Sequence, residues 1–258
     1  MRLRILTPVL AFSILLIFGC AEEKPASVMP VTTDSELALE LYQTGMVAHD
    51  QLKEKLAWQN LYMAVEQDSE FFMAYFWMYY MSGKESKKLA EKAFQCDVQL
   101  NPGEEQARKA LKYLVEGQEE KVVEHLQNLV EMYPADPYTH KILYLLQHLY
   151  FKDNEAAIIT LERAIRECPD YAFAYNILGY AYMELEQYDE AEKAFDQYIK
   201  AAPDLANPYD SKGDFYMTTK QFEKAFDSYM KAFEIDSAFT VSEKKAKKAK
   251  QMLEKMSQ

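Results

Sequence analysis

The chain has 258 residues, of which 49% are hydrophobic and only 7 are glycine. Its abundant alanine, leucine, glutamate, lysine, methionine and tyrosine favour helices, and its length is ample for a large core or for an array of smaller ones. A formal net charge of −12 argues against a nucleic-acid partner, because phosphate binding needs clustered lysine and arginine.

Residues 1–19 have the pattern of an export signal. Arg2 and Arg4 precede an apolar run, residues 5–18, which is too short for a comfortable membrane span. The tetrapeptide IFGC that ends at Cys20 resembles the lipobox of bacterial lipoproteins. The resemblance implies that the signal is removed and that Cys20 carries acyl chains such as palmitate, which anchor the protein to a membrane. The alternative is an ordinary secretory signal with an incidental cysteine.

Residues 20–34 contain two prolines and no apolar period, which predicts a lipidated N-terminus followed by a flexible linker. The lipoprotein resemblance implies a place in the bacterial cell envelope, with the outer membrane as the expected membrane and its periplasmic or surface face left open. The folded part of the chain is expected to begin at residue 35.

Small and aromatic residues recur 34 positions apart in the second half of the chain. Gly179 is followed at that distance by Gly213, and Tyr182 by Tyr216. This period resembles the tetratricopeptide repeat, most specifically over residues 138–239 and more loosely before them. The unit that matches the family pattern best has Tyr175, Leu178, Gly179, Tyr182, Ala191, Phe195 and Pro203 at the pattern positions.

The resemblance implies an all-α fold, a right-handed superhelical α-solenoid of about six antiparallel helix pairs over residues 35–239. A solvating helix over residues 240–258 is expected to cap the array. Small residues let the two helices of a pair approach closely, and stacked units bury apolar faces that one pair cannot bury alone. The sequence departs from the pattern at Lys212, which replaces the usual leucine, and at Leu145, which replaces a glycine.

No catalytic or metal-binding constellation is expected. All seven glycines have structural roles, and none of the four histidines has a metal-ligand spacing. Cys96 and Cys168 fall two units apart, roughly 20 Å at helix packing distances, so they are predicted to be free thiols. The sequence therefore predicts a protein that is not an enzyme and needs no cofactor or metal. An envelope enzyme is the alternative, and it requires polar side chains that converge in the folded chain.

In this family, ligands usually lie in a concave groove lined by the first helix of each pair. The residues expected at such positions are Phe76, Tyr80, Ile142, Leu146, Phe173, Asn176, Tyr180, Met183, Asn207, Asp210 and Asp214. The resemblance implies a non-catalytic scaffold that holds another protein or peptide segment there. Members that bind chaperones clamp a terminal carboxylate with lysine, arginine and asparagine. Aspartate and tyrosine stand here instead, so that activity is not carried over.

Two of the expected first helices, residues 71–81 and 142–151, are apolar on nearly every side. A helix of this kind must be covered on every side. The cover is either a partner segment in the groove, or the chain itself in a tightly curved array, or a second copy through self-association. A further alternative is a protein that captures a small apolar ligand.

Overall fold

The computed structural model describes residues 28–82 and 86–256, which form thirteen α-helices, one π-helical turn and no strand. The expected signal, Cys20 and the first part of the linker lie outside these residues. No helix in the described ranges is both long enough and apolar enough to cross a membrane.

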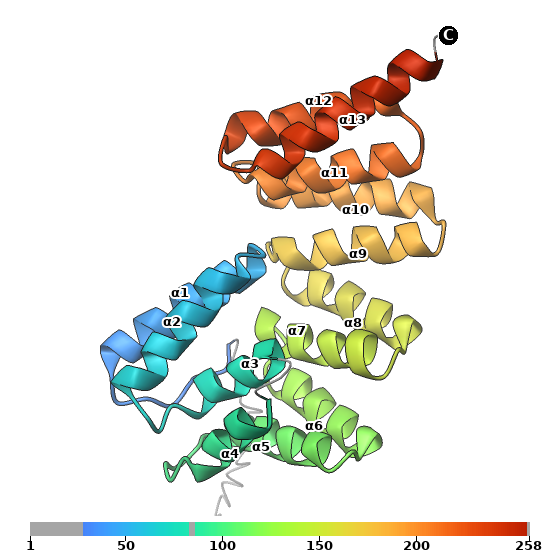
Figure 1. Cartoon of the computed structure of the whole chain (residues 1–258). Helices are drawn as coiled ribbons and strands as arrows, with labels where there is room; N and C mark the ends of the chain where they lie inside the picture. Colours follow the sequence, from blue (N-terminus) through green and yellow to red (C-terminus); the bar gives the residue numbers. More distant parts are fainter. Residues whose placement is uncertain (1–27, 83–85, 257–258) are drawn as a thin grey trace, which may run out of the picture.

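Twelve of the α-helices form six antiparallel pairs, and the thirteenth closes the array (Figure 1). Unit 1 is α1 (Glu36–Asp50) and α2 (Glu54–Gln67), unit 2 is α3 (Phe72–Ser82) and α4 (Ser86–Gln95), and unit 3 is α5 (Pro102–Val115) and α6 (Glu119–Met132). Unit 4 is α7 (Pro137–Leu145), the π-helical turn η1 (Leu146–Tyr150) and α8 (Asn154–Glu167), unit 5 is α9 (Ala172–Glu184) and α10 (Tyr188–Ala201), and unit 6 is α11 (Ala206–Thr218) and α12 (Phe222–Ile235). The last helix is α13 (Thr240–Met256). The predicted solenoid of six pairs and a cap is confirmed.

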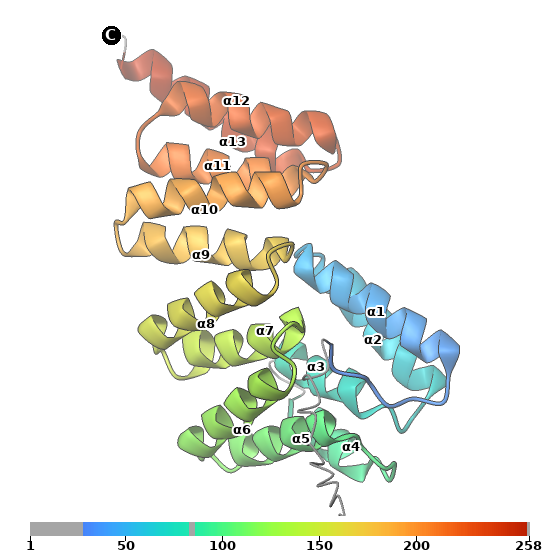
Figure 2. The same ribbon diagram turned by 180° about the vertical axis from the view of Figure 1, so that it is seen from behind.

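Units 3 to 6 stack on one another in chain order, whereas unit 1 leans away from them (Figures 1 and 2). The turn between α1 and α2 meets the stack again at the start of α9. There Asp50 accepts hydrogen bonds from Lys141 and Tyr171. The array is therefore closed on itself between its first and fifth units.

Glycine sets the distance between the helices of units 5 and 6. A β-carbon added to Gly179 would lie 2.7 Å from the ring of Phe195, and one added to Gly213 would lie 2.5 Å from the ring of Tyr229. These distances are shorter than any van der Waals contact, so the aromatic ring of the second helix takes the space that glycine leaves on the first. The recurring glycine and aromatic residue thus form one interlocking contact per unit.

The turn inside each pair also repeats. Lys152, Glu186 and Lys220, which follow one another at 34 positions, all adopt left-handed backbone conformations, with φ of 59°, 58° and 60°. Gly117 has φ of 72° at the corresponding turn of unit 3. The same backbone geometry therefore reverses the chain in units 3 to 6.

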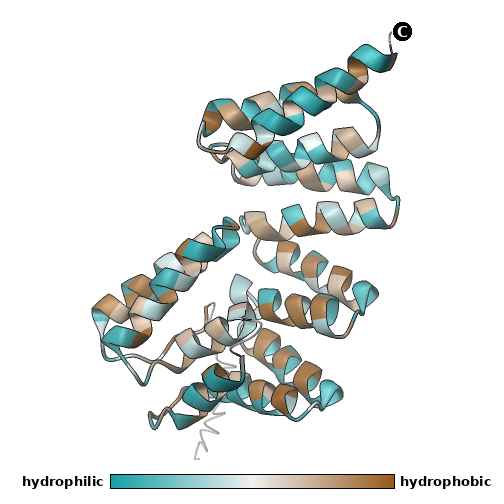
Figure 3. Cartoon of the chain, in the orientation of Figure 1, coloured by the Kyte–Doolittle hydropathy of each residue, from teal (hydrophilic) through white to brown (hydrophobic). Residues whose placement is uncertain are grey.

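The largest core cluster joins units 1 to 4. Its centre is α3 with the residue that precedes it, and all residues from Phe71 to Tyr79 are buried. Of the three alternatives for covering this apolar helix, the structure shows burial by the chain itself. By contrast, α13 buries only Ser242, Ala246 and Ala249, and Figure 3 shows it as mostly hydrophilic, as expected of a cap.

Candidate partner-binding groove

The concave face is filled along much of its length by the chain itself. Of the eleven residues expected to line the groove, six are buried and five are partly exposed. The buried six are Phe76, Ile142, Leu146, Phe173, Asn176 and Asp210. The partly exposed five are Tyr80, Tyr180, Met183, Asn207 and Asp214. The expectation of an open groove over all eleven residues is therefore corrected. Two segments of the chain, one before the first unit and one after the last, cover part of this surface.

The first cover is the segment 28–33, named here the N-terminal strap. The Met29 N–H donates to Asp136 over 2.9 Å, and the Thr32 N–H donates to Glu104 over 2.7 Å. Burial raises the pKa of Asp136, and the hydrogen bond from Met29 opposes that shift. The flexible linker predicted over residues 20–34 is thus wrong for this part. Its backbone donors and its methionine find buried partners that a composition-based prediction does not reveal.

The second cover is the cap helix. Lys245 of α13 donates to Asp210 over 2.6 Å and to Asp214 over 2.8 Å, and the Ser242 hydroxyl donates to Asp210. Burial opposes the charge of Lys245, but the hydrogen bonds to the two carboxylates outweigh it and raise the pKa of Lys245. Tyr180 also donates to Asp214. These two aspartates hold the cap in place, so they are not open groove residues.

A buried ion pair closes unit 1 on unit 4. The Lys141 ammonium lies 2.5 Å from Asp50 and 4.2 Å from the centre of the Phe173 ring, and its side chain is 0% exposed. Burial lowers the pKa of Lys141, and Asp50 opposes that shift. Sequence reasoning missed this pair, although Lys141 occupies the position at which units 5 and 6 have Tyr175 and Tyr209.

One cleft remains beside the covered face. It has a volume of about 280 Å³ and lies between the α1–α2 turn and the turns that precede α11 and α13. Its walls include Tyr198, Asn207 and Phe239, with Lys53 at the α1–α2 turn. Asn207 donates to the Tyr198 hydroxyl over 2.9 Å, which fixes its amide in the cleft. Of the expected groove residues, Asn207 is the one that lines this cleft.

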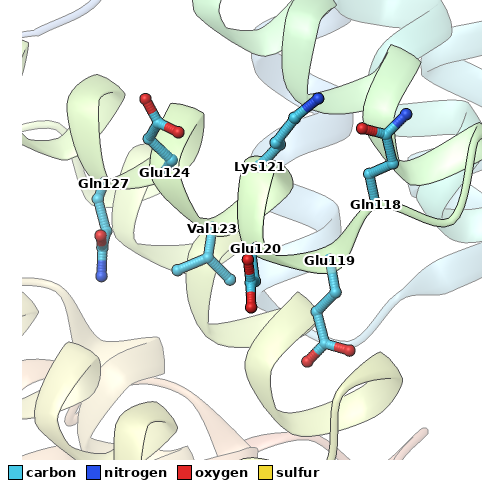
Figure 4. A pocket seen from close by; sticks show the side chains of 7 residues that line it. All are labelled: Gln118, Glu119, Glu120, Lys121, Val123, Glu124 and Gln127. Atoms are coloured by element: carbon cyan, nitrogen blue, oxygen red, sulfur yellow. The ribbon is translucent and has the colours of Figure 1, made fainter.

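A larger depression, of about 820 Å³, lies over the start of α6 (Figure 4). Its side chains point in different directions, with Glu119 and Glu120 on one side and Lys121 and Gln118 on the other. All seven lining residues are exposed or partly exposed. Because no polar groups converge, this surface has no arrangement for acid–base chemistry. Within residues 28–82 and 86–256 no group of three His, Cys, Asp or Glu side chains could hold a metal ion.

The two cysteines of the solenoid are free thiols, as the repeat spacing predicts. Burial raises the pKa of Cys96 and that of Cys168 to about 11. Since the thiolate is the nucleophile, neither residue is activated for covalent chemistry at neutral pH.

His140 is expected to make the fold less stable in mild acid. Its Nε2 donates to the Pro134 carbonyl over 2.8 Å, and its Nδ1 is buried without a hydrogen-bond partner among the described residues. Burial lowers the pKa of His140. A histidine with a lowered folded-state pKa binds fewer protons folded than unfolded, so stability falls as the pH drops below the unfolded value of about 6.5.

We therefore expect the urea midpoint of the wild type to fall between pH 7.5 and pH 5.5, and to fall less in His140→Gln. His125, whose pKa burial also lowers, accounts for some of the remaining pH dependence. The matched control is His148→Gln, because His148 is partly exposed and bonded to Asn154. A wild-type pH dependence that His140→Gln leaves unchanged would contradict the assignment.

The comparisons with known proteins agree with this geometry. The tetratricopeptide repeat family matches residues 172–205 and again residues 206–239, which correspond to units 5 and 6. A search of curated proteins finds no match. A thermophilic TPR protein of Thermus thermophilus is 18% identical with a TM-score of 0.51, over 82% of this chain and 98% of that chain. MamA of Desulfovibrio magneticus RS-1, from residue 41 to its end, is 19% identical with a TM-score of 0.44, over 59% and 92%.

The similarity to the Thermus protein supports the fold alone, and the family matches identify the repeat. Both agree with the interlocking glycine and aromatic contacts of units 5 and 6 and with the stacking of helix pairs around them. Units 5 and 6 are therefore tetratricopeptide repeats, and the chain around them has the stacked helical-pair architecture of a tetratricopeptide-repeat solenoid.

Proposed function

We propose that the protein is a non-catalytic scaffold that is anchored by lipid at Cys20 in the bacterial envelope and holds a segment of a partner protein. The observation that carries the proposal is the cleft of about 280 Å³ between the α1–α2 turn and units 5 and 6. It combines apolar walls, Phe239 and Ile235, with the fixed amide of Asn207 and the exposed carboxylate of Asp204. Mixed walls of this kind suit a peptide, which offers both side chains and backbone groups.

The position of the N-terminal strap supports the anchored arrangement. Val28 is eight positions after Cys20, so the lipid would be at most about 28 Å from the solenoid at roughly 3.5 Å per residue. The strap ends on units 3 and 4, whereas the cleft lies at units 5 and 6. The membrane would therefore lie nearer to the units that hold the strap, and the cleft would face partners farther along the array.

Site-specific photocrosslinking in cells tests the binding site. A photoreactive residue at Asn207 should form adducts with a partner, whereas one at Lys193, exposed on α10, should not. In parallel, Cys20→Ala should move the protein from the membrane fraction to the soluble fraction. Equal adduct yields at Asn207 and Lys193 would refute the cleft as the binding site, and unchanged fractionation of Cys20→Ala would refute the lipid anchor.

A further inference from the structure

The N-terminal strap is held on the concave face in the way that a bound peptide is held. Two carboxylates that are almost inaccessible, Glu104 at 0% exposure and Asp136 at 3%, accept its backbone N–H groups three residues apart. Glu104 also accepts the hydroxyl of Thr32. A buried carboxylate that loses its donors is costly. Each carboxylate also accepts a backbone N–H at the start of a helix, from Asn101 to Glu104 and from Tyr138 to Asp136. The other oxygen of each, Oε1 of Glu104 and Oδ2 of Asp136, is the acceptor available to an extended segment.

The strap also has a side-chain anchor. Met29 is 8% exposed and packs on Gly103, where an added β-carbon would lie 2.8 Å from the Met29 sulfur. The same β-carbon would lie 2.5 Å from the ring of Tyr133. Asn101 donates to the Pro30 carbonyl over 2.9 Å. The solenoid therefore makes specific contacts with the methionine, with the backbone after it and with the threonine three positions later.

The strap does not fill the site. A cavity of about 150 Å³ remains beneath it, between Val28 and Val31 of the strap and the side chains of Phe76, Trp77 and Ile142. A cavity of about this volume with apolar walls accommodates a benzene ring. Val28 and Val31 line this volume but leave it open, so a bulkier apolar side chain in place of Val31 would gain contacts that the strap lacks.

We propose that the strap is an internal occupant of a peptide site on units 2 to 4, and that a partner segment replaces it. The partner is an extended segment that keeps methionine and threonine at the spacing of Met29 and Thr32 and carries an aromatic residue where Val31 stands. This inference rests on the proposed scaffold function and assigns it a second site, separate from the cleft at Asn207. Binding here also frees the strap, which lengthens the arm between Cys20 and the first helix.

The test uses the full chain with residues 28–33 replaced by alternating glycine and serine, together with two capped peptides. One has the strap sequence VMPVTT, and the other has phenylalanine in place of Val31. Fluorescence anisotropy should show that both bind the substituted chain, with the phenylalanine peptide about tenfold tighter, or ~1.4 kcal/mol. Both should bind the wild type at least tenfold more weakly, because its own strap competes. A strap peptide with valine in place of Thr32 should bind more weakly than VMPVTT.

Three outcomes would overturn the proposal. The first is a substituted chain that is folded by circular dichroism but binds neither peptide. The second is equal affinity for the valine and phenylalanine peptides. The third is a small apolar molecule that native mass spectrometry finds retained in the cavity of the purified wild type. If the substituted chain does not fold, Val31→Phe in the intact chain decides the question. It should raise the thermal midpoint and slow amide exchange over residues 29–33, and a lowered midpoint would refute the fit.

The two proposals fail separately. If the peptides do not bind but Asn207 still forms crosslinks, the exchange of the strap is refuted and the scaffold function stands. If the peptides bind but Asn207 forms no crosslink, the cleft is refuted as a binding site and the strap site stands.

Discussion

Replacing Asp50 with alanine should lower the free energy of unfolding by about 3–5 kcal/mol, the cost typical of a buried ion pair that loses one partner. The Lys141 ammonium, with its side chain 0% exposed, would keep its burial and lose the carboxylate 2.5 Å away. The Tyr171 hydroxyl, which donates to Asp50 over 3.1 Å, would lose its acceptor as well. Because these contacts join unit 1 to units 4 and 5, the substitution should also open the closed array. Urea denaturation followed by circular dichroism measures the loss, and small-angle scattering measures the opening.

A substitution of Lys141, the other partner in the ion pair, provides the control. Lys141→Met replaces the ammonium with an apolar side chain of similar length, so it should cost much less than Asp50→Ala, and the double variant should recover most of the loss. Asp227→Ala, at an exposed position of α12, should change stability by no more than about 0.5 kcal/mol. Equal losses for Asp50→Ala and Asp227→Ala, or a double variant no better than Asp50→Ala, would show that the pair does not close the array.

The sequence predicts units 5 and 6 well because their determinants are local. Gly179 faces the ring of Phe195, and Ala191 packs in the same core cluster as Phe195, within a single helix pair. A pattern with a 34-residue period therefore records all three. Stacking of units follows from the same residues, since each unit contacts mainly its neighbours. The cap is predictable for a similar reason, because a last helix with one narrow apolar stripe covers only the unit before it.

Closure of the array could not be predicted in this way. Asp50 and Lys141 are 91 positions apart, and Met29 and Asp136 are 107 apart. No repeat pattern encodes contacts at these separations, because they do not recur. The sequence does show where to look: Lys141 and Lys212 stand at positions the repeat reserves for other residue types, and both are buried against carboxylates. Lys212 is 3% exposed and lies 2.8 Å from Asp196.

The candidate binding site, like the fold, has features that the sequence predicts and features that it does not. Six of the eleven residues expected in the groove are buried. Asp210, for example, is covered by the cap helix, whose Ser242 lies 32 positions later in the chain. The apolar character of residues 71–81 showed that cover was needed. It did not show that unit 1 and the N-terminal strap provide it, since the strap has the composition of a linker.

Substituting Phe195 with alanine should cost about 3–5 kcal/mol, as truncation of a buried phenylalanine does. Its side chain is 0% exposed, and its ring lies 5.2 Å from that of Tyr180 and 6.1 Å from that of Phe215, centre to centre. Phe215 belongs to unit 6, so the loss should weaken the interface between units as well as the pair itself. Phe94→Ala is the matched control, because Phe94 is 39% exposed and should lose far less.

A double-mutant cycle with Gly179 tests the interlocking contact directly. In the wild type, Gly179→Ala places a methyl group 2.7 Å from the Phe195 ring and should cost about 1–3 kcal/mol through overpacking. In the Phe195→Ala background the ring is gone, so the same substitution should be neutral or should stabilise, by up to the roughly 1 kcal/mol that alanine gains over glycine in a helix. Urea denaturation of the four chains gives the coupling energy. If Gly179→Ala destabilises both backgrounds equally, the glycine is required for some reason other than the aromatic ring that faces it.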